Sequence, residues 1–316
     1  MRVLVTGGQG CIGAWVIKRL LDRDIDVMMF DVDPTPTRLP LIASREEIAR
    51  VSMKQGRVED TASVKALVKD EGITHIVHLA AVLIPFCQQQ PVSGAIVNVL
   101  GTLNLFEAAR DAERPVRIVY ASSAAVWGPE EAYGSQALSE DETLKPATHY
   151  GVFKQANEGN ARVFHSLNGI SSVGLRPWTV YGVGRDQGMT ADPTLAIRAL
   201  ANGERFQIRL SGFMDLQYVA DVADTFIECL LSPLEGAHVF NLAGEVIHMD
   251  AFHRTLVDLD SRAEELVTIA GPQVPVAFRM DDSQLRAKIG NLPKTPLQQG
   301  VAETYDRFRR LRETAV

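Results

Sequence analysis

Tyr150 and Lys154 stand four residues apart in the segment Tyr-Gly-Val-Phe-Lys, so a helix would place the phenol and the ammonium on one face. A tyrosine ordinarily titrates near pH 10, and acting as a base at neutral pH requires a pKa lower by about 3 units, or about 4 kcal/mol. The positive charges of a neighbouring ammonium and of a nicotinamide stabilise the phenolate, so they lower the pKa of the tyrosine. The pair therefore predicts proton exchange with a hydroxyl group. The same spacing also suits a surface tyrosine beside a solvated lysine.

Two hydroxyl side chains precede this pair in the sequence. Ser122 and Ser123 follow the apolar run 116–121, which predicts a strand, and they would lie at its carboxyl end. Open α/β sheets bind ligands at that edge. A hydroxyl there could hold a substrate alcohol while Tyr150 exchanges its proton. The alternative is that the serines only hydrogen-bond within a turn.

The N-terminal residues 3–13 predict a strand, a glycine turn and a helix, with Gly7, Gly10 and Gly13 spaced as G-x-x-G-x-x-G. Small residues let backbone N–H groups approach a pyrophosphate at the start of a helix. Asp31 ends the next predicted strand, where a carboxylate would bind the adenosine ribose and repel a 2′-phosphate. The pattern therefore favours NAD over NADP, although Asp31 could also be a solvated strand end.

The elements that must position these groups alternate between strands and helices, which predicts an α/β fold with a Rossmann-type doubly wound parallel sheet and a smaller C-terminal substrate lobe. The expected strands share short apolar or β-branched runs: 2–6, 26–31, 51–56, 75–78, 116–121 and 172–176. Apolar residues at helical spacing predict the crossover helices: Ile12, Trp15, Val16, Leu20; Val64, Leu67, Val68; and Val99, Leu103, Phe106.

A longer helix should run over 150–168, because Gly169 follows as a natural stop. After Arg176 the alternation weakens. We therefore assign 1–176 with 213–245 to an NAD-binding domain, and 177–212 with 246–316 to a substrate-binding lobe. Within the lobe, Asp192 should cap a helix that ends at Gly203.

The composition excludes several classes of protein. The chain has 316 residues, 46% of them hydrophobic, a net charge of −7 and no basic block, so nucleic acid and membrane are not expected partners. The three cysteines are scattered, which argues against disulfides and a thiolate metal site and favours a cytoplasmic location. His78 is expected to lie beneath the cofactor without binding metal, because no second ligand stands at helical spacing.

In this order and spacing, the segments resemble the NAD-dependent epimerase/dehydratase family of the extended short-chain dehydrogenase/reductase superfamily over essentially the whole chain. The matching stretches are TGGQGCIG at 6–13, Asp31, HLAA at 78–81, NVLGTLNLFEAAR at 98–110, YASSAAVWG at 120–128, YGVFK at 150–154, RPWTVYGVGR at 176–185 and QYVADVA at 217–223.

The resemblance implies a role for each matching position. Ser123, Tyr150 and Lys154 would be catalytic, with Ser123 chosen over Ser122 because it directly precedes Ala-Ala-Val-Trp-Gly. The implied cofactor contacts, besides Gly7, Gly10, Gly13, Asp31, Tyr150 and Lys154, are Cys11, Ile12, Val58, Leu79, Ala80, Ala81, Asn98, Ala121 and Pro177. The resemblance also implies a homodimer that pairs through the helix carrying Tyr150 and the helix near 98–110.

Departures from the family pattern narrow the chemistry. Ser123-Ala124-Ala125 stands where dehydratases resemble Thr-Asp-Glu, so water elimination is not expected. Thr179 and Met214 replace an asparagine and an arginine that are usual in nucleotide-sugar members, which points to a smaller sugar or sugar acid. Arg185, Arg205 and Arg209 are candidates for holding a carboxylate or phosphate, and each could equally be solvated.

Three functions remain open at this point. A sugar or nucleotide-sugar epimerase is favoured by the resemblance, and an NAD-dependent dehydrogenase of a free sugar or sugar acid is favoured by the departures. A non-catalytic NAD(H)-sensing module would be expected to lack Tyr150 or Lys154, and both are present.

Overall fold

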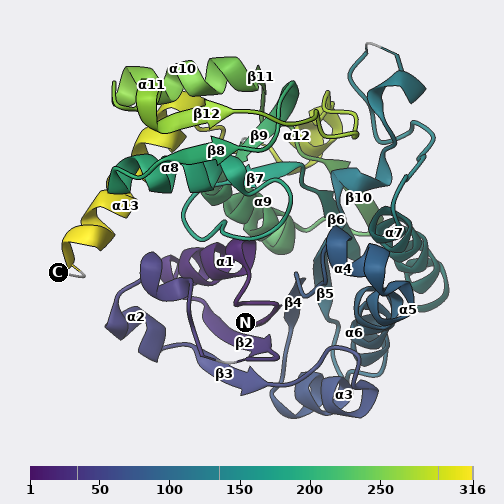
Figure 1. Ribbon diagram of the computed structural model, residues 1–316. Coiled ribbons are helices and arrows are strands. Elements are labelled where there is room, and N and C mark those ends of the chain that lie inside the picture. The colour runs from purple at the N-terminus through teal and green to yellow at the C-terminus, as the bar shows by residue number, and fades with distance from the viewer. Residues whose placement is uncertain (34, 135, 291, 315–316) are drawn as a thin grey trace.

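The computed structural model describes residues 1–316 except 34, 135, 291, 315 and 316. Its central feature is a parallel sheet that has seven strands in the described part of the chain (Figure 1). In spatial order the strands are β10 (Ala237–Asn241), β6 (Ser172–Arg176), β5 (Arg117–Ala121), β4 (His75–His78), β1 (Arg2–Thr6), β2 (Asp26–Asp31) and β3 (Ser52–Gln55). The order 3-2-1-4-5-6 from β3 onward is that of a doubly wound dinucleotide-binding sheet, which confirms the predicted fold.

Helices cover both faces of this sheet (Figure 1). One face packs against α1 (Cys11–Asp22) and α9 (Val219–Leu231), and the other against α3 (Thr61–Asp70), α6 (Gly101–Arg110) and α7 (His149–Asn168). Each layer has its own hydrophobic core: Val16 and Leu20 belong to the first, and Val64 and Phe106 to the second. The remaining helices beside the sheet are α2 (Arg45–Ala49), α4 (Ile84–Gln89) and α5 (Pro91–Ala95).

A smaller lobe lies over the carboxyl ends of the strands and is built from two short sheets and surrounding helices (Figure 1). The sheets are β11 (Glu245–His248), β9 (Phe213–Tyr218) and β7 (Thr179–Tyr181), and β12 (Val267–Ile269) with β8 (Phe206–Ile208). The helices are α8 (Asp192–Asn202), α10 (Met249–Leu259), α11 (Ala263–Leu266), α12 (Ser283–Ile289) and α13 (Leu297–Thr314).

The predicted strands match the observed ones to within a residue or so, and α7 ends at Gly169 in the left-handed conformation as expected. Residues 213–245 return β10 to the main sheet, whereas β9 pairs with β7 and β11. One local prediction is wrong. The N-cap position of α8 is Ala191, without a side-chain cap hydrogen bond, and the Asp192 carboxylate instead accepts from the Arg209 backbone nitrogen at 2.7 Å and from Arg209 Nη2 at 2.6 Å. The division into two domains stays a prediction.

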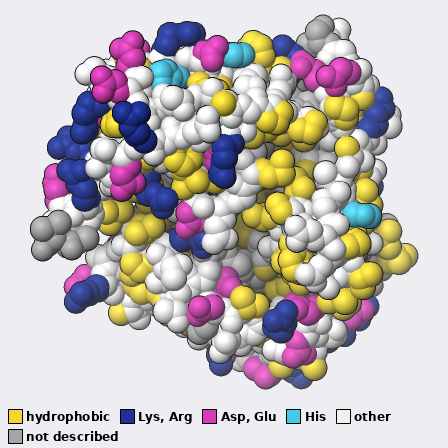
Figure 2. Space-filling model, viewed as in Figure 1, with side chains coloured by type: hydrophobic (Ala, Val, Ile, Leu, Met, Phe, Trp, Pro, Cys, Tyr) yellow, Lys and Arg dark blue, Asp and Glu magenta, His cyan; other side chains and the backbone are white. Residues whose placement is uncertain are grey.

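Residues 91–110 form one continuous helical stretch that contains a π-helical turn at Ile96–Leu100. This stretch has a mean hydropathy of 1.3 and is long and apolar enough to cross a membrane. Half of it is buried inside the protein, as in the core helix of a globular protein. Its outer side exposes Val92, Ile96 and Leu100. Apolar side chains gather over the right-hand side of the face in Figure 2, where Figure 1 places α4, α5 and α7.

Candidate functional site

The turn between β1 and α1 closes so tightly that two of its glycines have no room for a side chain. A Cβ at Gly13 would lie 2.3 Å from the Gly7 carbonyl oxygen, and one at Gly7 would lie 2.6 Å from the Ala80 nitrogen. Helix α1 begins after Gly10 with no side-chain cap, and the first turn of the helix lines a cavity. The turn therefore offers uncapped backbone N–H groups where a pyrophosphate would bind.

Asp31, at the carboxyl end of β2, is held against this turn. Its Oδ2 accepts a hydrogen bond from the Gln9 nitrogen at 3.0 Å, and its Oδ1 accepts one from the Val32 nitrogen at 2.8 Å. The carboxylate is thus fixed beside the glycine turn, where the predicted ribose contact requires it.

The two serines after β5 have separate partners. Ser122 is buried and donates to Glu158 Oε1 at 2.5 Å. Ser123 accepts a hydrogen bond from the Ala125 nitrogen at 3.1 Å and is hydrogen-bonded to the phenol of Tyr150. Only Ser123 of the two is therefore paired with the predicted catalytic tyrosine.

Tyr150 and Lys154 lie on the first turns of α7 and face the end of β5. The Lys154 Nζ is 5.4 Å from the centroid of the Tyr150 ring and donates to the Ala121 carbonyl at 2.7 Å. Burial lowers the pKa of Lys154 to about 8. Burial also raises the pKa of Tyr150 to about 12, while the hydrogen bond with Ser123 and the charge of Arg185 act in the opposite direction.

This result differs from the predicted lowering of the tyrosine pKa by Lys154. The ammonium is itself desolvated and directed at the Ala121 carbonyl, so the loss of water around the phenol dominates. In this structure the phenol holds its proton at neutral pH.

A cavity of about 620 Å³ runs from the glycine turn to the small lobe and contains most of the predicted site. The predicted residues that line it are Gly7, Gly10, Cys11, Ile12, Gly13, Leu79, Ala81, Ala121, Ser123, Tyr150, Lys154, Pro177, Thr179 and Arg185. Sequence reasoning did not single out Trp178, Val274 and Val276, which line its lobe side. No spacing rule could have found the two valines, because they lie about 100 residues beyond Thr179 in an irregular segment.

Four predicted cofactor contacts lie outside this lining: Asp31, Val58, Ala80 and Asn98. Asn98 is buried, and its side-chain amide is engaged with the Val82 backbone, accepting from the nitrogen at 2.8 Å and donating to the oxygen at 2.9 Å. Its side chain therefore shapes the loop after β4. Val58 is buried, and its carbonyl accepts a hydrogen bond from Asn104 at 2.9 Å.

His78 lies in the protein interior between two threonines. Its ring nitrogens are 2.7 Å from the Thr6 hydroxyl and 3.0 Å from the Thr102 hydroxyl. Burial lowers the pKa of this histidine to about 3, so it is neutral at physiological pH. Within the described residues, no group of three His, Cys, Asp or Glu side chains could hold a metal ion.

A buried ion pair behind the serines was missed. Glu158 accepts from Arg176 Nε and Nη2, both at 2.8 Å, and the guanidinium lies 4.7 Å from the Trp127 ring centroid. Because Glu158 follows Lys154 by four residues, it shares the helix face of Tyr150 and Lys154, and this spacing could have identified it. The pair fixes the end of β5 through Ser122.

A second missed feature connects the glycine turn to the small lobe. Arg38 donates to the Gln9 carbonyl at 2.5 Å and to the Gly184 carbonyl at 3.0 Å, and it forms an ion pair with Asp186 at 2.6 Å. Gly184, Asp186 and Arg38 all line the cavity. We refer to residues 182–188 as the strap and to the Arg38–Asp186 pair as the latch.

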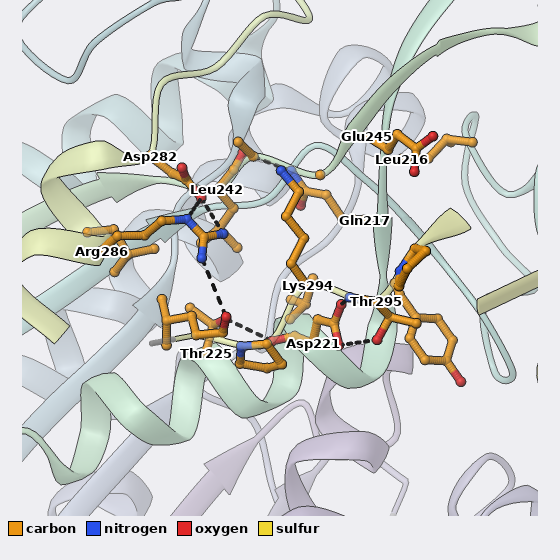
Figure 3. Close-up of a pocket in the computed structure, with 18 residues that line it drawn as sticks. Leu216, Gln217, Asp221, Thr225, Leu242, Glu245, Asp282, Arg286, Lys294 and Thr295 are labelled. Atoms are coloured by element: carbon orange, nitrogen blue, oxygen red, sulfur yellow. Dashed lines mark hydrogen bonds and ion pairs between the residues drawn. The ribbon is translucent and has the colours of Figure 1, made fainter. Parts of the chain in front are cut away.

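A separate cavity of about 280 Å³ lies between α9 and the C-terminal segment of the small lobe, away from these groups (Figure 3). Asp221 accepts from the Thr295 nitrogen at 2.5 Å and from its hydroxyl at 2.8 Å, and Arg286 is paired with Asp282 at 2.9 Å. None of the predicted site residues lines this cavity. The Asp221 carboxylate fastens the C-terminal segment to α9, and the Asp282–Arg286 pair lies at the start of α12.

The chain matches the NAD dependent epimerase/dehydratase family over residues 3–243 and belongs to it. The UDP-glucose 4-epimerase of Mycolicibacterium smegmatis is 29% identical over 98% of this chain and 99% of that protein. UDP-glucuronate 4-epimerase 3 of Arabidopsis thaliana is 34% identical over 57% of this chain and 42% of that protein. The UDP-glucose 4-epimerase of Thermus thermophilus, in complex with NAD, is 27% identical with a TM-score of 0.82, covering 98% and 99% of the two chains.

These findings confirm the predicted family and cofactor: the protein is an NAD-dependent enzyme of the extended short-chain dehydrogenase/reductase type. The residues present suit the cofactor, because the uncapped first turn of α1, the close-packed glycines and the Asp31 carboxylate lie together at the edge of the sheet.

Proposed function

We propose that this enzyme acts on a secondary alcohol of a sugar or nucleotide-sugar substrate and inverts it as an epimerase. The observation that carries the proposal is that Ser123, Tyr150 and Lys154 line the same cavity as the glycine turn. The relatives that act on UDP-glucose and UDP-glucuronate support the substrate class.

Bound NAD supplies the acceptor for the hydride that leaves the alcohol carbon. Ser123 donates its hydroxyl hydrogen to the substrate oxygen and holds that oxygen against Tyr150. Tyr150 takes the hydroxyl proton during oxidation and returns it during reduction. Lys154, held by the Ala121 carbonyl, places a positive charge beneath the phenol ring. Burial raises the pKa of Tyr150 without the cofactor, and the positive charge of the nicotinamide in bound NAD would lower it, so that the phenolate can accept the proton during oxidation.

A dehydrogenase of a free sugar or sugar acid is the second candidate. It would use the same three side chains and release NADH with the oxidised product. The small number of cations along the cavity favours it, because only Arg38, Lys154 and Arg185 among the described lining residues carry a positive charge. A nucleotide diphosphate is ordinarily held by several charge-assisted hydrogen bonds.

The substitution Tyr150→Phe tests the proposal. It removes the hydroxyl and keeps the ring, so turnover should fall by roughly 10²- to 10⁴-fold while the dissociation constant for NAD stays unchanged. Steady-state kinetics and calorimetric titration with NAD measure the two quantities. A variant with full turnover would contradict the assigned role.

We further propose that the protein is a cytoplasmic homodimer. The exposed residues Val92, Ile96 and Leu100 recur every four positions, and Val152 and Val163 are exposed on the neighbouring α7. Apolar stripes on two adjacent helices are the surface that a two-fold helical interface would bury.

A further inference from the structure

Three large apolar side chains line the cavity that contains Tyr150 and are nevertheless exposed to solvent. They are Leu83, Phe86 and Met189, and they are 37% to 48% exposed. Single apolar side chains on a surface are ordinary, whereas several that converge on one cavity mark a place where a ligand covers them. Because they are both exposed and part of the lining, these three side chains lie where the cavity opens to solvent.

The loop after β4 holds Leu83 and Phe86 in a fixed position. The Asn98 side-chain amide binds both backbone polar groups of Val82, accepting from the nitrogen at 2.8 Å and donating to the oxygen at 2.9 Å. Helix α4 begins directly after Leu83 and carries Phe86 in its first turn. We refer to Leu83 and Phe86 as the platform. Its backbone is already ordered, so a ligand that binds there loses little free energy to ordering the loop.

The platform lies beside the helix that carries Tyr150. Gln88 on α4 accepts a hydrogen bond through Oε1 from the backbone nitrogen of His149 at 2.9 Å. His149 directly precedes Tyr150 at the start of α7. The exposed apolar surface is therefore tied to the same turn of helix as the phenol, and a group attached to the reacting sugar would reach it.

The end of the strap faces the platform. A Cβ at Gly188 would lie 3.3 Å from Leu83 Cδ1, so the two segments nearly touch. Met189 follows Gly188 and lines the same cavity. The opening thus has the platform on one side and Met189 on the other. None of these three side chains carries a charge or a hydrogen-bonding N–H or O–H group, so a sugar hydroxyl or a phosphate would gain no strong partner from them.

We propose that Leu83, Phe86 and Met189 form a subsite for an apolar group, and that the substrate is a sugar-type alcohol linked to an alkyl or aryl group. This assignment rests on the hydride-transfer function proposed above and names the substrate class for it. The apolar group would cover the three exposed side chains and remove their surface from water, which is the main favourable contribution to such binding. The sugar itself would extend inward to Ser123 and Tyr150.

The test is calorimetric titration of the NAD-loaded protein with glycosides that differ only in the apolar group. Phenyl β-D-glucoside and phenyl β-D-galactoside are each compared with the methyl glycoside of the same sugar. The wild type should bind at least one phenyl glycoside roughly 10-fold or more tightly than its methyl partner, because the ring buries more apolar area.

Two substitutions place a polar amide at the opening without a large change in size. Leu83→Gln and Met189→Gln should each weaken binding of the preferred phenyl glycoside by roughly 3- to 10-fold and leave the affinities for NAD and for the methyl glycoside unchanged. Leu231→Gln is the matched control, because Leu231 at the end of α9 is 40% exposed and does not line the cavity. It should bind both glycosides as the wild type does.

Equal binding of phenyl and methyl glycosides by the wild type would overturn the inference, as would a phenyl preference that survives in either variant. UDP-glucose gives a further outcome: if both variants weaken its binding as much as that of the phenyl glycoside, the opening holds a nucleotide and the apolar assignment is wrong. These outcomes are separate from failure of the proposed function. If Tyr150→Phe kept full turnover while the phenyl preference depended on Leu83 and Met189, the subsite would stand and the proposed catalytic role would be wrong.

Discussion

At the scale of single residues, the site depends on which polar atoms are already occupied. Ser122 is bound to Glu158, whereas Ser123 interacts with Tyr150, so two adjacent and chemically identical side chains have different partners. The Asn98 amide is likewise engaged with Val82, while Arg185 keeps a donor without a partner among the described residues. The spacing of residues in the sequence identifies candidate side chains. The hydrogen bonds that each side chain makes in the fold then determine whether it is free to bind a substrate.

Asp215 gives a prediction at this scale. The carboxylate is fully buried in β9 and accepts from the Gly244 nitrogen at 2.7 Å and from Gln217 Nε2 at 2.9 Å. Burial nevertheless raises the pKa of Asp215 from 3.8 to about 7. The folded state therefore holds the proton more tightly than the unfolded chain does. Its stabilising contribution is complete below pH 4 and is lost as the pH rises to about 7.

Asp215→Asn should remove this dependence, so the variant's free energy of unfolding should change less than that of the wild type between pH 4.5 and 7.5. The difference should be about 3 kcal/mol. Urea denaturation at several pH values measures it, with Asp24→Asn at an exposed aspartate as the control. Identical pH profiles for the wild type and Asp215→Asn would show that this carboxylate does not titrate as described.

At the scale of elements, the strands and helix α7 could be predicted because local patterns determine them. Runs such as 2–6 and 172–176 are buried strands, and α7 has Gly169 at its end. The buried face of the helix at 91–110 is harder to predict, because a π-helical turn at Ile96–Leu100 rotates the residues that follow it about the helix axis. Leu105 is buried with Phe106, whereas Leu103, expected from regular spacing, is only half-buried.

The contacts between elements distant in sequence could not be predicted. The latch joins Arg38 to Asp186, which are 148 positions apart, and β9 leaves the main sheet to pair with β7. Such pairings depend on the placement of the small lobe. Periodicity carries no information about that placement, and so the lobe side of the cavity was identified least well.

The prediction at the scale of elements is that the strap, residues 182–188, slows the release of the cofactor. The strap carries glycines with positive φ at Gly182 and Gly184, and it is fastened by Trp15 Nε1, which donates to the Val183 carbonyl at 2.8 Å, as well as by Arg38. Because latch and strap line the cavity beside the glycine turn, they should slow cofactor release.

Arg38→Gln should raise the NADH dissociation rate by roughly 10-fold, and Asp186→Asn by a smaller factor because it leaves the carbonyl contacts intact. Stopped-flow fluorescence of NADH measures both rates. Arg50→Gln, which breaks the exposed ion pair with Asp24, is the control and should release NADH at the wild-type rate. Unchanged dissociation in both latch variants would show that the strap does not retain the cofactor.

At the scale of the whole molecule, the apolar stripes on 91–110 and α7 give a prediction of assembly. Val92 is 74% exposed and Val163 53% exposed, values that are costly for an isolated monomer. The wild type should therefore be a dimer by light scattering at micromolar concentration, and Ile96→Glu should shift it to monomer. Val246→Glu, at an exposed valine of the small lobe, should remain dimeric. A monomeric wild type would contradict the proposed interface.

The central claim is that the Tyr150 phenol exchanges a proton with a substrate alcohol while the hydride moves to NAD. A single-turnover experiment at 340 nm, with NAD-loaded enzyme and a saturating preferred sugar, tests it most directly. The wild type should form enzyme-bound NADH, and Tyr150→Phe should form it roughly 10²-fold or more slowly with an unchanged affinity for NAD. Equal rates of NADH formation in the two proteins would contradict the account.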